Sequence, residues 1–288
     1  MDFKNAQELL TLCDENKLKI SAVMLRRECD ETECSEESAV KRMKKALEIM
    51  RDSVENPIKH PRKSMGGLIG GEAEKLSRSE GKLSGKVLGK VMCYAVGVLE
   101  VNASMGLIVA APTAGSSGVV PGLLLAMQDE LDVTDDQIVE ALFNAAAVGY
   151  LAMRNATVAG AVGGCQAEIG VASAMAASAA VELMGGTPKQ CLDAAGMVLM
   201  NMLGLVCDPV GGLVEYPCQS RNAAGVANAA VAAEMALAGI AQLIPFDEML
   251  DTMFKVGKKL PAELRETALG GCAATPTACQ LCKNINHK

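Results

Sequence analysis

The sequence has few of the side chains that nucleic-acid binding requires. It contains no tryptophan, three tyrosines and four phenylalanines in 288 residues, and its formal net charge is −7. Nucleic-acid grooves combine a basic surface with stacking rings. We therefore expect no nucleic-acid partner.

Histidine and the common nucleotide motifs are also scarce. Only His60 and His287 could serve a catalytic triad, and neither lies in a suggestive setting. The chain has no GxxxxGK(S/T), no GxGxxG after a strand and no GxSxG. These absences argue against a nucleotide-binding protein and against a serine hydrolase.

No long run of large apolar residues is present. The most apolar stretch, residues 158–184, consists mostly of Ala, Gly and Val and contains Gln166, Glu168 and Glu182. Such a stretch is typical of a buried helix rather than of a membrane span. The first residues, "MDFKNAQELL", lack the apolar region of a signal peptide. We expect a cytoplasmic protein with no membrane partner.

The pattern along the chain predicts an all-α fold. Apolar residues in "SEESAVKRMKKALEIMRDSVE" keep helical spacing behind Ser35, a suitable N-cap. Thr134 with Gln137 and Thr187 with Gln190 have the form of capping boxes. Runs such as "AAGVANAAVAAEMALAGIA" favour helices and lack the residues of strands. We predict a compact multi-helix domain with close-packed Ala- and Gly-rich helices.

Three regions are expected within one structural domain. Residues 1–55 are predicted to form amphipathic helices that pack on the core. Residues 56–85 contain two prolines and six glycines and are predicted to form a connecting loop. Residues 86–288 are predicted to form the helical core and a C-terminal tail.

One turn concentrates hydroxyl groups. In "PTAGSSG", Thr113, Ser116 and Ser117 accompany free backbone N–H groups before a helix start. Such a nest suits an anion such as a carboxylate or a phosphate. A plain connection between two helices has the same composition, so the pattern leaves both interpretations open.

The eleven cysteines need an explanation in a reducing compartment. Cys165, Cys207 and Cys218 lie at Gly- or Pro-rich breaks, where the backbone can wrap around an inorganic group. A single "CQLC" near the end is a weak zinc signal. Thiolates without histidine favour an iron–sulfur cluster, while ordinary burial of cysteine is the alternative.

Five segments in order resemble a known family. The segments "EVNASMG", "PTAGSSGVVPG", "NATVAGAVGGCQAEIG", "NMLGLVCDPVGGLVEYPC" and "RETALGGCAATPT" resemble the signatures of the catalytic (alpha) subunit of iron–sulfur-dependent L-serine dehydratases. The N-terminal "AVMLRRE" and "SAVKRM" also fit, so the resemblance covers essentially the whole chain. It implies an all-helical lyase of serine degradation and gluconeogenesis that converts L-serine into pyruvate and ammonia without pyridoxal phosphate.

The resemblance also implies a cofactor. A [4Fe-4S] cluster would be held by Cys165, Cys207 and Cys218, which leaves one iron open as a Lewis acid for the substrate hydroxyl. In single-chain relatives a cysteine of the C-terminal tail can occupy that iron. Cys279 is the candidate here, although the tail continues nine residues further and Cys272 stands where leucine is usual.

Roles for other residues follow from this resemblance. We assign Thr113, Ser116 and Ser117 to the substrate carboxylate, and Asn102 and Asn155 to orienting hydrogen bonds.

The general base has three possible sources. Glu168 and Glu215 are candidates within the chain, and each could equally be a structural carboxylate. Two-subunit members of the family pair this chain with a smaller beta subunit, whose SSSHT-type motif supplies a histidine. That motif is absent here, so we expect a beta partner. The alternative functions are an L-cysteine desulfidase-like lyase and a non-catalytic cluster-bearing subunit.

Overall fold

The computed structural model describes residues 1–79 and 81–285. Over these residues the chain is helical without a β-strand, and one isolated bridge pairs Cys207 with Arg265. The predicted all-α fold is confirmed. The helices are α1 (Ala6–Asn16), α2 (Ile20–Thr32), α3 (Glu36–Lys59), α4 (Glu72–Ser77), α5 (Gly85–Ala103), α6 (Val119–Leu131), α7 (Asp135–Asn155), α8 (Gly160–Gly163), α9 (Val171–Leu183), α10 (Pro188–Asn201), α11 (Cys218–Leu237), α12 (Phe246–Lys259) and α13 (Pro276–Ile285).

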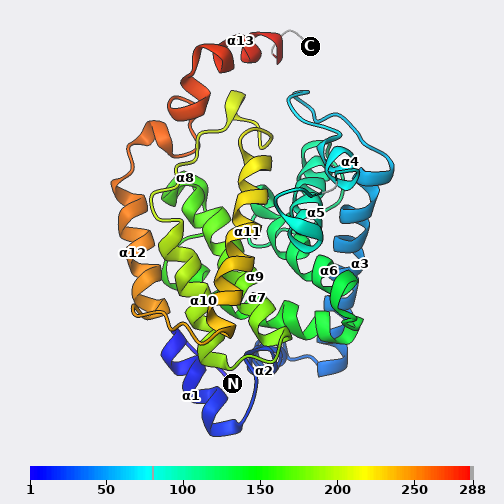
Figure 1. The fold of residues 1–288 in the computed structure, drawn as a ribbon. Coiled ribbons are helices and arrows are strands. Elements are labelled where there is room, and N and C mark those ends of the chain that lie inside the picture. Colours follow the sequence, from blue (N-terminus) through cyan, green and yellow to red (C-terminus); the bar gives the residue numbers. More distant parts are fainter. Residues whose placement is uncertain (80, 286–288) are drawn as a thin grey trace.

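Helix α9 forms the centre of the bundle. Its residues from Val171 to Glu182 are all buried, and half of them are alanine. Helices α6, α7, α10 and α11 pack around it. Figure 1 shows α3 and α12 on opposite sides of this bundle, α1 and α2 at one end, and α13 at the other. Because the central side chains are small, the surrounding helices approach one another closely.

Gly118, the N-cap of α6, lies close against the backbone of α5. A Cβ atom added there would lie 2.2 Å from the carbonyl oxygen of Ala95. We expect Gly118→Ala to lower the free energy of unfolding by about 1–3 kcal/mol, because the extra methyl group forces the two helices apart. Urea denaturation measures this difference. Gly89→Ala is the control, because its Cβ would meet only the flexible Ser84 hydroxyl, and an equal loss in both variants would contradict the explanation.

The predicted helix starts are confirmed. The Ser35 hydroxyl accepts the N–H of Ser38, and Thr134 and Thr187 each form a complete capping box. Local sequence is sufficient for these signals because both partners of each cap lie within three residues.

The predicted loop over residues 56–85 needs a correction. Helix α3 continues to Lys59, and residues 72–77 form helix α4. The carboxylate of Glu100 accepts the N–H groups of Glu72 and Ala73 at 2.7 and 2.9 Å. This cap stabilises the start of α4 from a helix 28 positions away in sequence, so no local pattern could reveal it.

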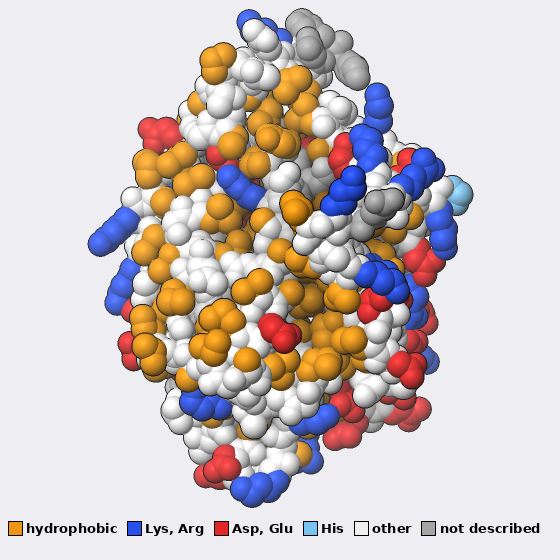
Figure 2. Space-filling view, in the orientation of Figure 1, with side chains coloured by type: hydrophobic (Ala, Val, Ile, Leu, Met, Phe, Trp, Pro, Cys, Tyr) orange, Lys and Arg blue, Asp and Glu red, His pale blue; other side chains and the backbone are white. Residues whose placement is uncertain are grey.

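None of the helices in residues 1–79 and 81–285 combines the length and the apolarity that crossing a membrane requires. One face still exposes apolar side chains. Figure 2 shows many of them in front of α10 and α11, with most charged side chains around the edges. The exposed members on these helices and the connection to α12 are Met200, Val231, Met235, Ile240, Leu243 and Ile244.

Candidate active site

Three buried cysteines, Cys165, Cys207 and Cys218, lie in three different elements, and the first two meet beside Glu168. Cys165 precedes a single turn of π-helix, η2 (Gln166–Gly170), Cys207 lies in an extended segment, and Cys218 begins α11. The sulfur atoms of Cys165 and Cys207 and a carboxylate oxygen of Glu168 all lie within 4.8 Å of one another. Burial, followed by the charge of Cys165, raises the pKa of Cys218 to about 12. This donor set is suited to a thiophilic metal.

The backbone around Cys207 is held by the chain that follows α12. The Cys207 N–H donates to the carbonyl oxygen of Leu264 at 2.9 Å, and Glu266 N–H donates to the Cys207 carbonyl at 2.7 Å. A hydrogen bond with Cys165 and burial together raise the pKa of the Cys207 thiol far above its ordinary value. Protein groups alone therefore favour the neutral thiol of Cys207, and a bound metal would favour its thiolate.

Glycine is required at position 160, beside Cys207 and Glu168. A Cβ atom there would lie 3.0 Å from the Cys207 sulfur and 2.6 Å from Oε2 of Glu168. The backbone of α8 thus forms one wall of the cysteine site, and any larger residue would occupy the space in front of the sulfur.

An arginine lies next to the cysteines. Arg221, one turn into α11, has its Nη1 3.6 Å from the Cys165 sulfur and 2.9 Å from the carbonyl oxygen of Val206. The same nitrogen pairs with the buried Asp208 at 2.6 Å. Asp208 in turn accepts the N–H of Cys272 at 2.6 Å. Arg221 therefore connects Cys165, the Cys207 segment and the C-terminal tail.

Glu168 is the carboxylate nearest to the thiols. Its Oε1 accepts the hydroxyl of Thr113 at 2.9 Å, and its Oε2 lies 3.7 Å from the Cys207 sulfur. Burial raises the pKa of Glu168, the charge of Glu266 adds to this effect, and the Thr113 hydrogen bond opposes it. A half-buried carboxylate with a raised pKa is a stronger base than a fully solvated one.

Glu215 has a different environment. Its two oxygens accept the Ser64 hydroxyl at 2.6 Å and the N–H groups of Gly66 and Leu68 at 2.6 and 3.1 Å. Both oxygens are thus committed to the 64–68 segment. Of the two predicted carboxylates, Glu168 is the one that lies beside the cysteines.

A substitution tests this structural role of Glu215. We expect Glu215→Gln to lower the free energy of unfolding by about 1–3 kcal/mol, because an amide nitrogen cannot accept the hydrogen bonds that one oxygen now accepts. Chemical denaturation of the metal-free chain measures the loss. The exposed Glu48 on α3 supplies the control variant, Glu48→Gln, and an unchanged Glu215→Gln variant would show that these bonds contribute little.

The predicted hydroxyl turn lies against Glu168. Besides its bond to Glu168, the Thr113 hydroxyl lies 3.1 Å from that of Ser116. The Ser117 hydroxyl instead donates to the carbonyl of Ala114 at 2.8 Å. The structure therefore brings Thr113 and Ser116 to the cysteine site, while Ser117 stabilises the turn itself.

Comparison with known proteins identifies the family. A family model described as "Serine dehydratase alpha chain" matches residues 15–273. The chain belongs to this family. Dehydratases are carbon–oxygen lyases, so the alpha-chain family is a family of enzymes.

Several alpha-chain relatives match nearly end to end. The "Probable L-serine dehydratase, alpha chain" of Bacillus subtilis is 49% identical over 98% of this chain and 95% of its own length. The "L-serine dehydratase, alpha chain" of Peptoniphilus asaccharolyticus is 42% identical over 94% of each chain. The "L-serine dehydratase" of Helicobacter pylori is 36% identical over 95% of this chain. The match spans 62% of that longer relative.

Two predicted site residues, Asn102 and Asn155, form no hydrogen bond with the cysteines, Glu168 or the hydroxyl turn of this alpha-chain site. The Asn155 amide donates to the carbonyl of Lys4 at 2.8 Å on an exposed surface. Asn102 lies in the last turn of α5, and its side chain forms no hydrogen bond with any residue that the structure describes. Their orienting roles stay predictions.

The C-terminal tail contacts the segment around the cysteine site through Cys272 and α13, and not through the predicted Cys279 thiol. The Cys279 thiol lies 4.0 Å from the carbonyl of Ala273 within the tail. Helix α13 packs on η3 (Val210–Gly212), where the Cys282 sulfur would lie 3.5 Å from a Cβ atom added at Gly211. The N–H of Cys272 binds Asp208, as described above. The role of Cys279 as a fourth ligand stays a prediction.

Sequence reasoning missed Asn222 and Arg221. The Asn222 amide donates to the carbonyl of Gly115 at 2.8 Å, and its oxygen accepts the Gly118 N–H at 3.1 Å. It therefore holds the hydroxyl turn. The available signal was helical spacing, because residues three and four positions after Cys218 return to its face of α11.

Proposed function

We propose that this chain is the catalytic alpha subunit of an enzyme that converts L-serine into pyruvate and ammonia with a [4Fe-4S] cluster. The observation that carries the proposal is the convergence of Cys165, Cys207, Glu168 and the hydroxyl turn in a chain of this family, with the buried Cys218 close enough for the charge of Cys165 to raise its pKa. A scaffold subunit has no need for a hydroxyl-rich turn beside its metal ligands, which favours the catalytic role.

The residues present fit the cluster. Cys165, Cys207 and Cys218 would hold it, and Gly160 keeps the space before the Cys207 sulfur clear. Three thiolates leave one iron of a four-iron cluster without a protein ligand. When bound, the cluster supplies a Lewis acid that binds the substrate hydroxyl and makes it a better leaving group.

The other residues bind the substrate and move its proton. Thr113 and Ser116, with the backbone N–H groups of their turn, would bind the substrate carboxylate and hold Cα towards Glu168. Glu168 would take the α-proton, because partial burial raises the pKa of its carboxylate. The Thr113 hydroxyl orients this carboxylate and joins substrate binding to proton transfer.

A smaller beta-type chain would complete the enzyme. The alpha-chain names of the most similar relatives imply such a partner, and the longer relatives contain more than a third of their length outside the match. The partner would add residues beside the cysteine site, because His60, the one histidine among the described residues, forms no hydrogen bond with the cysteines, Glu168 or the hydroxyl turn.

Anaerobic purification tests the proposal. We expect about four irons and four sulfides per chain, and pyruvate formation from L-serine when the beta chain is present, with both lost in air. Parallel assays with L-cysteine separate dehydration from desulfuration. A metal-free chain that turns over serine fully would contradict the cluster, and pyruvate from cysteine alone would contradict the substrate.

A further inference from the structure

Two cysteines outside the site described above meet where α2 ends. Glu33 has the left-handed backbone conformation, with a φ of 49°, and the N–H of Cys34 donates to the carbonyl of Cys29 at 3.2 Å. This is the Schellman arrangement of a helix end, in which the side chains of the two bonded residues commonly contact one another. The reversal of the chain after α2 therefore sets the Cys29 and Cys34 thiols side by side.

Both thiols of this pair are accessible to small reagents. Cys29 and Cys34 are half-buried, whereas Cys13 and Cys191 are buried. A disulfide requires two Cα atoms less than about 7 Å apart, and the direct backbone hydrogen bond between the two residues keeps them within this span. A disulfide can therefore form here with little movement of the backbone.

An arginine of the next helix lies against the Cys34 sulfur. Nη2 of Arg42, in the second turn of α3, lies 3.5 Å from this sulfur. The same nitrogen pairs with the carboxylate of Glu28 at 2.9 Å, which fixes the position of the guanidinium. A cation at this distance favours the thiolate of Cys34, and the thiolate is the nucleophilic form of cysteine.

The Thr32 hydroxyl is the second group that stabilises this thiolate. It lies 3.1 Å from the Cys34 sulfur and 2.7 Å from the carbonyl oxygen of Glu28. Because a hydroxyl has a single proton, Thr32 can donate to the sulfur when Cys34 is a thiolate and to the carbonyl when Cys34 is a thiol. The hydroxyl thus adapts to either form of Cys34.

The two thiols differ in their tendency to ionise. The Thr32 hydroxyl lowers the pKa of Cys34, partial burial opposes this effect, and Arg42 adds to it. Burial, followed by the charge of Cys34, raises the pKa of Cys29. An accessible thiolate beside a neutral thiol is the arrangement of redox-active cysteine pairs, in which the first attacks an oxidant and the second resolves the product.

We propose that Cys34 and Cys29 form a reversible redox modification site, at which Cys34 reacts with a hydroperoxide and Cys29 converts the product into a disulfide. The Cys34 thiolate attacks one peroxide oxygen, the O–O bond breaks, and the other oxygen takes up a proton and leaves as water or an alcohol. The Cys29 sulfur then attacks the sulfenic acid of Cys34, and the hydroxide leaves with the Cys29 proton as water. The two thiols are oxidised by two electrons and the peroxide is reduced by two.

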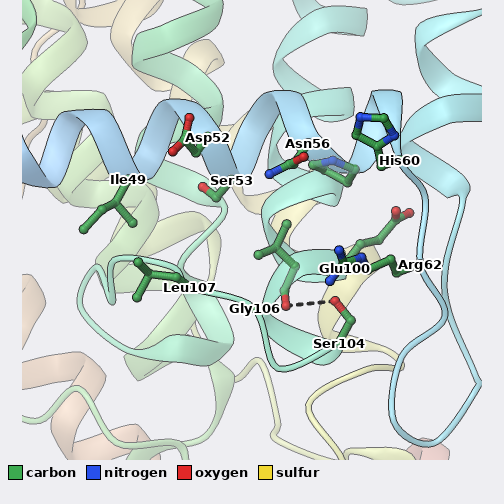
Figure 3. A pocket seen from close by; sticks show the side chains of 12 residues that line it. Ile49, Asp52, Ser53, Asn56, His60, Arg62, Glu100, Ser104, Gly106 and Leu107 are labelled. Carbon is green, nitrogen blue, oxygen red and sulfur yellow. Dashed lines mark hydrogen bonds between the residues drawn. The ribbon is translucent and has the colours of Figure 1, made fainter.

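This site is separate from the hollow at the other end of α3. Figure 3 shows that hollow, which has a volume of about 250 Å³ and is lined by Arg62 and His60 among other residues. About 25 Å of helix lies between Arg42 and the end of α3 at Lys59. Arg62 is exposed, so its replacement removes the same charge as a change of Arg42 without touching the thiol pair.

Peptide mapping of the full-length, metal-free chain tests the proposal, because no iron then consumes the peroxide. Residues 28–41 contain both cysteines and no internal lysine or arginine, so trypsin releases them as one peptide by cleavage after Arg27 and Lys41. With one equivalent of hydrogen peroxide we expect this peptide to lose two hydrogens before the peptides that carry Cys13 and Cys191 change. Dithiothreitol should restore both thiols.

Three variants separate the roles of the residues. Arg42→Gln should slow disulfide formation at least about threefold, because the thiolate loses its nearby cation, whereas Arg62→Gln should react like the unaltered chain. Cys29→Ser should leave Cys34 as a sulfenic acid that a 1,3-diketone reagent traps. Each variant leaves the 28–41 peptide recognisable by its mass.

The outcomes that overturn the proposal are distinct from a failure of the proposed function, because neither iron nor serine enters the assay. A 28–41 peptide that stays reduced while Cys13 or Cys191 is oxidised overturns the modification site. An Arg42→Gln variant that reacts as fast as the unaltered chain, or slows no more than Arg62→Gln, overturns the activation of Cys34. A sulfenic acid that persists in the unaltered chain overturns the role of Cys29.

Discussion

Replacement of Cys207 by serine is expected to remove the cluster and serine turnover together. Cys207 lies nearest to both Cys165 and Glu168, and its backbone is fixed on both sides by Leu264 and Glu266. A hydroxyl is a poor ligand for iron in place of a thiolate, and the fixed backbone prevents another group from taking its position. Iron and sulfide analysis after anaerobic reconstitution, with pyruvate formation, should show a loss of at least about a hundredfold.

Cys93→Ser provides the matched control for this variant. Cys93 is also buried, and its thiol donates to the carbonyl of Ala73 at 3.2 Å, a bond that a serine hydroxyl can reproduce. We expect this variant to retain its iron and its activity. Retention of four irons and full turnover by Cys207→Ser would contradict the assignment of Cys207 as a ligand.

Glu168→Gln is expected to lower turnover about 10²- to 10⁴-fold while the iron content stays unchanged. The amide keeps the volume and can still accept the Thr113 hydrogen bond, but it cannot take a proton from the substrate. Because the loss lies in the proton transfer, kcat should fall more than the affinity for serine changes. Steady-state kinetics of the iron-loaded enzyme measure both.

Glu215→Gln separates the two carboxylates that the sequence could not distinguish. With its oxygens bonded to the 64–68 segment, its substitution should reduce stability and leave turnover per folded molecule largely intact. If Glu168→Gln retained its kcat and Glu215→Gln lost it, the roles would be exchanged. If both retained it, the base would have to come from the partner chain.

The all-α fold followed from sequence because helix signals are local. Ser35, Thr134 and Thr187 each find their capping partner within one turn, and the alanine-rich runs need no distant contact to favour a helix. Helix α4 lacks such a signal, since its start is capped by Glu100 of α5. Local pattern therefore predicted a loop there.

The candidate site was predictable in its cysteines but not in its carboxylates. Glu168 and Glu215 both follow a cysteine motif or lie inside one, and Glu168 is half-buried while Glu215 is buried. The two carboxylates differ in their contacts. Glu168 contacts Thr113 and Cys207, whereas Glu215 binds a segment about 150 positions away in sequence. Such contacts depend on the tertiary fold, and the same applies to Asn222.

The hydrogen bonds of Glu215 to the 64–68 segment couple that segment to the loop between Cys207 and Cys218. Glu215 lies in the loop between Cys207 and Cys218, so a metal that orders this loop also orders the carboxylate that binds Ser64 and its neighbours. By thermodynamic linkage, an interaction that orders the 64–68 segment through Glu215 strengthens metal binding by the same free energy by which the metal strengthens that interaction. Metal binding at the cysteines and order in the 64–68 segment are therefore expected to strengthen or weaken together, although Glu215 and that segment lie about 150 positions apart in sequence.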